Sequence, residues 1–179
     1  QDDVRWKYGL PPAGNANYAW IQHMIHHLAP NGKIGLVLAN GALSTQSSGE
    51  GEIRKNIINA DLVEGIVALP TQLFYSVTIP VTLWFISKNK KQKGKTLFID
   101  ARKMGYMVDR KHRDFTEEDI QKLADTFESF QNGTLEEVKG FCAVADLQTI
   151  EKQDYILTPG RYVGIEEQED DGEPFEEKT

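Results

Sequence analysis

Two apolar runs separated by a loop dominate the pattern of hydrophobic and polar positions along the chain. Residues 62–69 and 81–86 are rich in β-branched and aromatic side chains, and neither run alternates apolar with polar residues. Such runs predict strands that are covered on both faces, as in the centre of an α/β sheet. Pro70 and Pro80 bound the loop, because proline cannot continue a strand ladder. The pattern therefore predicts a strand, a loop at one end of a buried sheet, and a second strand.

An amphipathic helix and a further strand are expected earlier in the chain. Asn15 or Asn17 can cap the helix, and the Pro-Asn-Gly sequence at residues 30–32 ends it. Residues 33–39 form a short apolar run that predicts a strand inside a parallel sheet. Asn40 then lies at the carboxyl end of this strand, which is the edge where α/β proteins hold ligands.

A second helix is expected between this strand and the first of the two long apolar runs. Ser47 and Glu50 have the spacing of a capping box, in which each side chain bonds the backbone of the other. The resulting order is helix, strand, helix, strand. This alternation predicts a parallel sheet with right-handed crossovers.

The remainder of the chain predicts small additions to that sheet, each bounded by turn-forming or helix-capping residues. First come a strand at residues 96–99 and a loop at 102–114. A helix then starts at Thr116 and aligns four apolar residues on one face, namely Ile120, Leu123, Ala124 and Phe127. An apolar stretch at 140–145, a brief helix capped by Asp146 and a type II turn at 158–161 follow.

Composition places the chain among single soluble domains. It has 179 residues, of which 40% are hydrophobic and 26% charged. No apolar run approaches the roughly 20 residues that span a membrane, and no signal peptide opens the chain, so we expect a cytoplasmic protein. Cys142 is the single cysteine in the sequence, which excludes an internal disulfide and a cysteine-based zinc cluster.

The formal net charge of −7 is concentrated at the end of the sequence. Residues 166–179 contain eight acids and one base, which alone account for this value, whereas residues 1–165 have 19 of each. The acidic tail has too little apolar content to fold alone, and we expect it to be disordered. Because the body is neutral, the acidic total does not argue against a nucleic-acid partner.

Several sequence features resemble sites but lack essential parts. His23 and His27 share a helical face, but Met24 stands where a helical zinc-protease motif has glutamate, and no third ligand is suggested nearby, so we expect no metal. Glu50 would repel a phosphate from the glycine-containing stretch at residues 49–51. Cys142 has no local partner pattern for nucleophilic catalysis.

Basic residues gather in a lysine-rich turn and in the segment after the strand at residues 96–99. They could contact DNA phosphates, although solvated turns have the same composition, and the sequence leaves both interpretations open. The candidates are Lys88, Lys90, Lys91, Arg102, Lys103, Arg110, Lys111 and Arg113.

Five segments carry a family resemblance that covers nearly the whole chain. They are RWKYGLPPAGNANYAWIQHMIHHLAPNGKIGLVLANGAL, GEGEIRKNII, VALPTQLFYSVTIPVTLWFISKNK, LFIDARKMG and YILTPGRYVG. In this order and at these separations they resemble the modification subunit of type I restriction-modification systems. The resemblance implies an N6-adenine DNA methyltransferase that uses S-adenosylmethionine, and it implies DNA, a specificity subunit and a restriction subunit as partners.

The chain departs from that family pattern in one important way. It contains neither the catalytic Asn-Pro-Pro-aromatic sequence nor the glycine-rich cofactor motif. We interpret residues 1–165 as the C-terminal part of the methyltransferase domain and expect it to be inactive alone. The resemblance implies a partial Rossmann-like α/β sheet, in which residues 33–39, 62–69 and 81–86 are the fifth, sixth and antiparallel seventh strands, with flanking helices and small C-terminal additions.

The loop before the seventh strand is the candidate substrate site. An adenine inside a duplex must be flipped out to meet a methyl donor and is then held by stacking and hydrogen bonds. In related enzymes an aromatic residue of this loop stacks on the base, so the resemblance implies that role for Phe74 or Tyr75, with Asn40 beside them. Two alternatives stay open. In a non-catalytic α/β interaction module the two rings would pack as a lid on the core. A Rossmann-type transferase could instead act on RNA or a small molecule.

Overall fold

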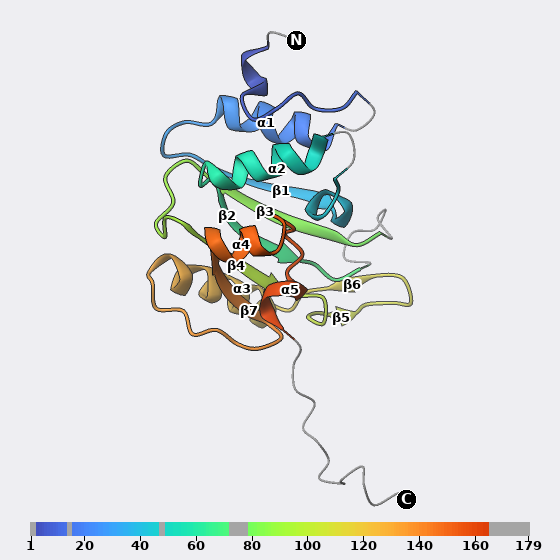
Figure 1. Ribbon diagram of the computed structural model, residues 1–179. Helices are drawn as coiled ribbons and strands as arrows, with labels where there is room; N and C mark the ends of the chain where they lie inside the picture. The colour runs from blue at the N-terminus through green and yellow to red at the C-terminus, as the bar shows by residue number, and fades with distance from the viewer. Residues whose placement is uncertain (1–2, 14–15, 47–48, 72–78, 165–179) are drawn as a thin grey trace, which may run out of the picture.

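The protein is built around a mixed β-sheet with helices on both faces (Figure 1). The computed structural model describes residues 3–13, 16–46, 49–71 and 79–164. Phe74 and Tyr75, Ser47 and the acidic tail therefore lie outside the described residues. The strands, in the spatial order β1-β3-β2-β4-β7, are β1 (Lys33–Ala39), β3 (Val81–Ser87), β2 (Val63–Ala68), β4 (Lys95–Asp100) and β7 (Cys142–Asp146).

Strand directions agree with the antiparallel seventh strand that the family resemblance implies, but two predictions from the pattern are wrong. The sheet is mixed because β3 separates β1 from β2, and β1 is half-exposed with β3 as its one partner among the described strands, so residues 33–39 do not lie inside a parallel sheet. β3 lies between β1 and β2 and is antiparallel to both, so β1 and β2 run in the same direction. β4 is parallel to β2, and β7 is antiparallel to β4. Every side chain of β2 is buried, as the absence of alternation in its sequence predicts. The carboxyl ends of β1, β2 and β4 consequently meet at one end of the sheet.

One face of the sheet packs against four of the helices and holds the larger core cluster, whose fully buried members include Tyr18, Ile21, Ile53 and Trp84. Ile21 and Ile25 belong to the predicted apolar stripe of the first helix, and Ile53, Ile57 and Ile58 to that of the second. The helices on this face are α1 (Asn17–His27), α2 (Glu50–Asn59), α4 (Leu147–Lys152) and α5 (Gly160–Val163).

The opposite face packs against α3 (Glu117–Gln131), which begins with a capping box between Thr116 and Asp119. Phe130 is buried there with Leu97 and Ile99 of β4. The predicted face of α3 is present, but Ile120 is 56% exposed, because this face borders an open groove of about 610 Å³ beside β3. The two core clusters therefore differ in how completely helices cover them.

Two predicted helix starts and a predicted turn are wrong in detail. Ala16 is the N-cap of α1, without a side-chain cap, and Gly49 in the left-handed region is the N-cap of α2. Pro159 has helical dihedral angles (φ −55°, ψ −35°), whereas the second residue of a type II turn requires ψ near +120°. Residues 158–161 therefore lead into α5 instead of forming that turn.

The segment expected to be a loop at residues 102–114 contains a small hairpin. β5 (Tyr106–Met107) pairs with β6 (Arg113–Asp114) in antiparallel register. Gly105 adopts φ +87°, and a Cβ there would lie 2.7 Å from the Asp114 carbonyl oxygen, so glycine is needed at this approach of the two strands. Short 3-10 helices at η1 (Val4–Trp6) and η2 (Asn40–Leu43) complete the described elements.

Candidate functional site

The carboxyl end of the sheet brings Asn40 to the base of the loop that precedes β3. Ala39, the last residue of β1, pairs with Val81, the first residue of β3. The backbone N–H of Asn40 donates to the Pro80 carbonyl at 3.1 Å, and the N–H of Leu69 donates to the Val81 carbonyl at 3.1 Å. The predicted neighbours Asn40 and the loop end therefore do adjoin, while Phe74 and Tyr75 lie outside the described residues.

Asn40 presents an unused acceptor at this edge. Its side-chain Oδ1 is buried and has no hydrogen-bond partner among the residues that the structure describes. A buried acceptor without a partner is costly, so one that persists at a strand end is suited to receive a donor from elsewhere. An exocyclic amino group of a base is a donor of this type.

The loop that follows Asn40 is held in place by a buried arginine. Arg54 of α2 is 1% exposed; its Nη1 donates to the Thr45 carbonyl at 2.7 Å and its Nε donates to the Tyr155 carbonyl at 2.7 Å. The Tyr18 hydroxyl donates to the Ala42 carbonyl at 2.5 Å, and burial raises the pKa of Tyr18 to about 12. These bonds fix the backbone of residues 42–45 beside the end of β1.

Sequence reasoning missed Arg54, although a signal was present. Arg54 lies three and four positions before Ile57 and Ile58, so it shares the apolar face of α2 and not its solvent side. Glu50 lies one turn earlier, where burial raises the pKa of its carboxyl group. A charged residue in phase with an apolar stripe predicts a buried, hydrogen-bonded group.

The structure divides the basic candidates between the two ends of the sheet. Those that follow β4 lie at the carboxyl end, which is also the end that holds Asn40, because β4 runs parallel to β2. Those that follow β3 lie at the amino end, because Ser87 pairs with Lys33, the first residue of β1. The first group is Arg102, Lys103, Arg110, Lys111 and Arg113, and the second is Lys88, Lys90 and Lys91.

Two lysines at the amino end bind other parts of the protein. The side chain of Lys90 is 1% exposed, and its ammonium lies 2.6 Å from an oxygen of Asp61, which also accepts from the N–H of Gly94. Lys88 Nζ donates to the Leu28 carbonyl at 2.7 Å. The lysine-rich turn is therefore attached to the chain segments that precede β1 and β2.

Some arginines at the carboxyl end also have internal partners. Arg102 forms an ion pair with Asp100 at 2.6 Å, and despite burial this guanidinium holds the pKa of the Asp100 carboxyl below its usual value. Arg113 Nη1 donates to the Met104 carbonyl at 3.0 Å. Arg110 and Lys111 are exposed at the tip of the hairpin.

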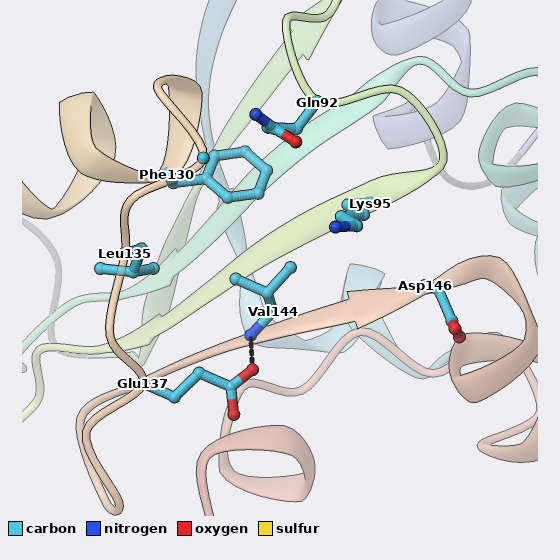
Figure 2. A pocket seen from close by; sticks show the side chains of 8 residues that line it. Gln92, Lys95, Phe130, Leu135, Glu137, Val144 and Asp146 are labelled. Carbon is cyan, nitrogen blue, oxygen red and sulfur yellow. Dashed lines mark hydrogen bonds between the residues drawn. The ribbon is translucent and has the colours of Figure 1, made fainter.

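A small cavity at the amino end carries no comparable chemistry. Figure 2 shows this cavity of about 310 Å³ between β4, β7 and the end of α3. Glu137 accepts a hydrogen bond there from the N–H of Val144 at 3.0 Å, and Asp146 caps α4 through the N–H of Thr149. Both carboxylates are thus used in holding the backbone.

The amino-acid sequence matches a known protein family over most of its length. The sequence model of the N-6 DNA methylase family matches residues 1–171. This chain belongs to the N-6 DNA methylase family.

Curated relatives agree with that assignment. The methylase subunit of the type I restriction enzyme HindI from Haemophilus influenzae is 61% identical over 99% of this chain. The MjaIX methylase subunit from Methanocaldococcus jannaschii is 52% identical, also over 99% of the chain. The chain spans 40% and 33% of the lengths of these two relatives.

Solved structures give the same fold. The methyltransferase subunit of a type I restriction-modification system from Streptococcus thermophilus superposes with a TM-score of 0.82 at 28% identity, over 92% of this chain and 34% of its own. The EcoKI M protein superposes with a TM-score of 0.66 at 18% identity. The predicted methyltransferase-type α/β fold is confirmed.

Two glycine-containing stretches lie at helix starts among the described residues. Gly41 lies within η2, and the glycines around Glu50 lead into α2 beside acidic side chains. A carboxylate at that helix start would repel an anionic group. In the described part of the chain, no helix is long and apolar enough to cross a membrane, and no cluster of three potential metal ligands occurs.

Proposed function

We propose that this chain is the C-terminal part of the catalytic domain of a type I DNA adenine methyltransferase, which transfers a methyl group from S-adenosylmethionine to adenine N6. Its family membership and its similarity to methylase subunits support the reaction class. The chain covers 40% of its Haemophilus influenzae relative, so we assign cofactor binding and methyl transfer to the longer protein. The specificity and restriction subunits are the proposed partners.

One observation gives this chain a defined share of that function. Asn40, with its unpaired Oδ1, is hydrogen-bonded to Pro80, where the loop containing Phe74 and Tyr75 rejoins the sheet. A flipped base needs a stacking surface and hydrogen bonds to its edge, and these residues could supply both. We therefore assign binding of the target adenine to this end of the sheet.

Alanine substitution in the full-length subunit tests the assignment. Stacking on a single base contributes roughly 1–3 kcal/mol, so Phe74→Ala or Tyr75→Ala should lower DNA binding or methyl transfer by about tenfold to a hundredfold. Transfer of labelled methyl groups to DNA is the measurement. Trp20→Ala, at an exposed aromatic of α1, is the matched control and should retain parental activity.

The outcome separates two interpretations of the loop. If both variants methylate DNA at the parental rate, the two rings cover the core and do not hold the base. Asn40→Asp provides a second measurement, because it keeps the size of the side chain and adds a charge next to the proposed base edge. Full activity of this variant would contradict a role for Asn40 in base binding.

A further inference from the structure

The β5–β6 hairpin exposes apolar side chains at the same end of the sheet as Asn40. Tyr106, Met107 and Val108 are 49%, 42% and 55% exposed, and they are consecutive in the sequence. Figure 1 shows the hairpin extending from the end of the sheet where β1 and β2 finish. Scattered exposed apolar residues are common, but here three occur in a row at a hairpin, where successive strand side chains point to opposite faces, so both faces of the hairpin present apolar groups to solvent.

The hairpin is firmly attached to the core on both sides. Ala101, directly after β4, is fully buried, and its N–H donates to the Ala68 carbonyl at the end of β2 at 2.9 Å. Met104 and Phe115, on either side of the hairpin, pack against the core cluster under α3. The guanidinium of Arg113 ties β6 to the Met104 carbonyl. The exposed residues are therefore presented on a fixed base.

The turn at the tip is also ordered by its own contacts. The N–H of Val108 donates to the His112 carbonyl at 2.8 Å. Asp109 accepts from the N–H groups of Lys111 and His112 at 2.7 and 3.0 Å, and its second oxygen lies 2.6 Å from His112 Nδ1. The carboxylate of Asp109 is thus engaged within the turn, whereas the side chains of Arg110 and Lys111 are exposed beside Val108.

Apolar residues flanked by exposed cations match one class of partner. DNA-binding proteins insert apolar side chains between bases and contact the neighbouring phosphates with arginine and lysine. The centre of a protein interface is instead depleted in charged residues, lysine in particular. The position of the hairpin at the same end of the sheet as the proposed adenine site further favours DNA.

We propose that the β5–β6 hairpin is a DNA-contacting wedge, in which Tyr106, Met107 and Val108 pack against bases near the target nucleotide while Arg110 and Lys111 contact phosphates. This inference rests on the proposed function. It assigns a second DNA contact, separate from the loop that contains Phe74 and Tyr75. The wedge supports the duplex where a base has left the stack.

Two double variants test the wedge in the full-length subunit assembled with its specificity subunit. Met107→Ser/Val108→Ser removes the apolar tip, and Arg110→Ser/Lys111→Ser removes the charges. Val138→Ser, at a residue that is 50% exposed, matches the apolar change, and Lys33→Ser/Lys93→Ser removes two exposed lysines from the amino end of the sheet. The probe is a fluorescein-labelled duplex of mixed sequence with one unpaired adenine, titrated over a range of salt concentrations.

The two double variants are expected to change different properties of DNA binding, one the affinity and the other the salt dependence. Because unstacked bases lose the apolar contact, Met107→Ser/Val108→Ser should weaken DNA binding by about tenfold with little change in salt dependence. Loss of two phosphate contacts in Arg110→Ser/Lys111→Ser should reduce the slope of log K against log salt by about 2. Both control variants should bind as the parent protein does.

Parental affinity and salt slope in both hairpin variants would overturn the proposal. The proposal would also be overturned if the hairpin variants lost the specificity subunit during co-purification while the remaining methylase subunit kept its DNA affinity. The hairpin would then contact protein and not DNA. Replacing Tyr106 with the photoreactive residue benzoylphenylalanine adds a direct measurement. Cross-linking to the duplex is expected, and cross-linking to protein alone would contradict the wedge.

The two proposals fail in different ways. If the parent complex methylates no adenine in DNA, the proposed function is wrong, while the affinity and salt slope of the hairpin variants still decide whether the hairpin binds DNA. If the parent complex methylates DNA and the hairpin variants match it in both binding and methylation, the wedge alone is wrong.

Discussion

The two ends of the sheet carry similar residue types for different purposes. At the amino end, Lys90 and Lys88 bond Asp61 and the Leu28 carbonyl, so their charges hold chain segments together. At the carboxyl end, Arg110 and Lys111 are exposed, and Asn40 Oδ1 has no partner among the described residues. The comparison teaches that a cluster of lysines indicates a binding surface only where the lysines do not already bond carboxylates or carbonyls of the same protein.

The largest expected effect comes from removing Arg54, which supports the carboxyl end. Arg54→Met should lower the free energy of unfolding by about 4 kcal/mol, because it leaves the partly buried carbonyls of Thr45 and Tyr155 without charged donors. Urea denaturation of the protein measures this loss. Lys55→Met, one position along the same helix, is the control and should have an effect of roughly 0.5 kcal/mol or less. Equal stability of the two variants would show that the Arg54 bonds contribute nothing net.

A comparable change at the amino end is expected to depend on which partner is removed. Asp61→Ala strands a buried ammonium and should cost about 3 kcal/mol of unfolding free energy. Lys90→Met should cost less, about 1 kcal/mol, because the carboxylate of Asp61 is partly exposed and still accepts from Gly94. Denaturation curves of both variants test this asymmetry, and a larger loss for Lys90→Met would reverse our assignment of the buried partner.

The edge strand β1, which ends at Asn40, should control self-association of the isolated chain. In the described part of the chain β1 pairs only with β3, and Val37 on its uncovered face is 44% exposed. Unprotected edge strands pair with other copies, so we expect the 179-residue chain to self-associate. Light scattering should show a shift toward monomer in Val37→Lys, because charge protects an edge. Monomeric parent protein at high concentration would contradict the expectation.

The smallest predicted effect concerns the pH response of the hairpin turn. The hydrogen bonds from His112 and from the Lys111 N–H hold the pKa of Asp109 below its ordinary value of 3.8. A lowered folded-state pKa stabilises the turn above the ordinary value, and this contribution is lost as the pH falls through the folded-state pKa. The step in the amide NMR shifts of Lys111 and His112 that reports protonation of Asp109 should therefore have its midpoint below pH 3.8. A midpoint at or above the ordinary value would show that the turn is open.

Much of the fold was predictable because burial leaves a strong signal in sequence. The apolar run at residues 62–69 is observed as the fully buried β2, and Thr116 starts α3 with a capping box. The hairpin was not predicted, because β5 and β6 have two residues each and lack any alternation. The start of α2 was missed because Gly49 reaches a left-handed cap that needs no side chain.

For the candidate site, the sequence indicated which end of the sheet to consider but not which side chains lie there. Asn40 was selected because it follows an apolar strand, and strand ends are where α/β proteins hold ligands; its position beside the end of the loop agrees with that selection, and its role in binding stays a prediction. Arg54 was missed because arginine in a helix is usually exposed, and only its phase relative to Ile57 and Ile58 indicates burial. The basic residues could not be sorted, since their positions depend on strand directions that only the fold defines.

The insertion of β3 between β1 and β2 affects how the protein can be made. During synthesis β1 leaves the ribosome before its described pairing partner β3, and α2, β2 and the loop must follow before the two can pair. An apolar strand that waits in this way is exposed to premature association with other chains. Completion of β3 should therefore mark the point at which the nascent chain becomes resistant to proteolysis, and slow translation between residues 40 and 80 should lower the yield of folded protein.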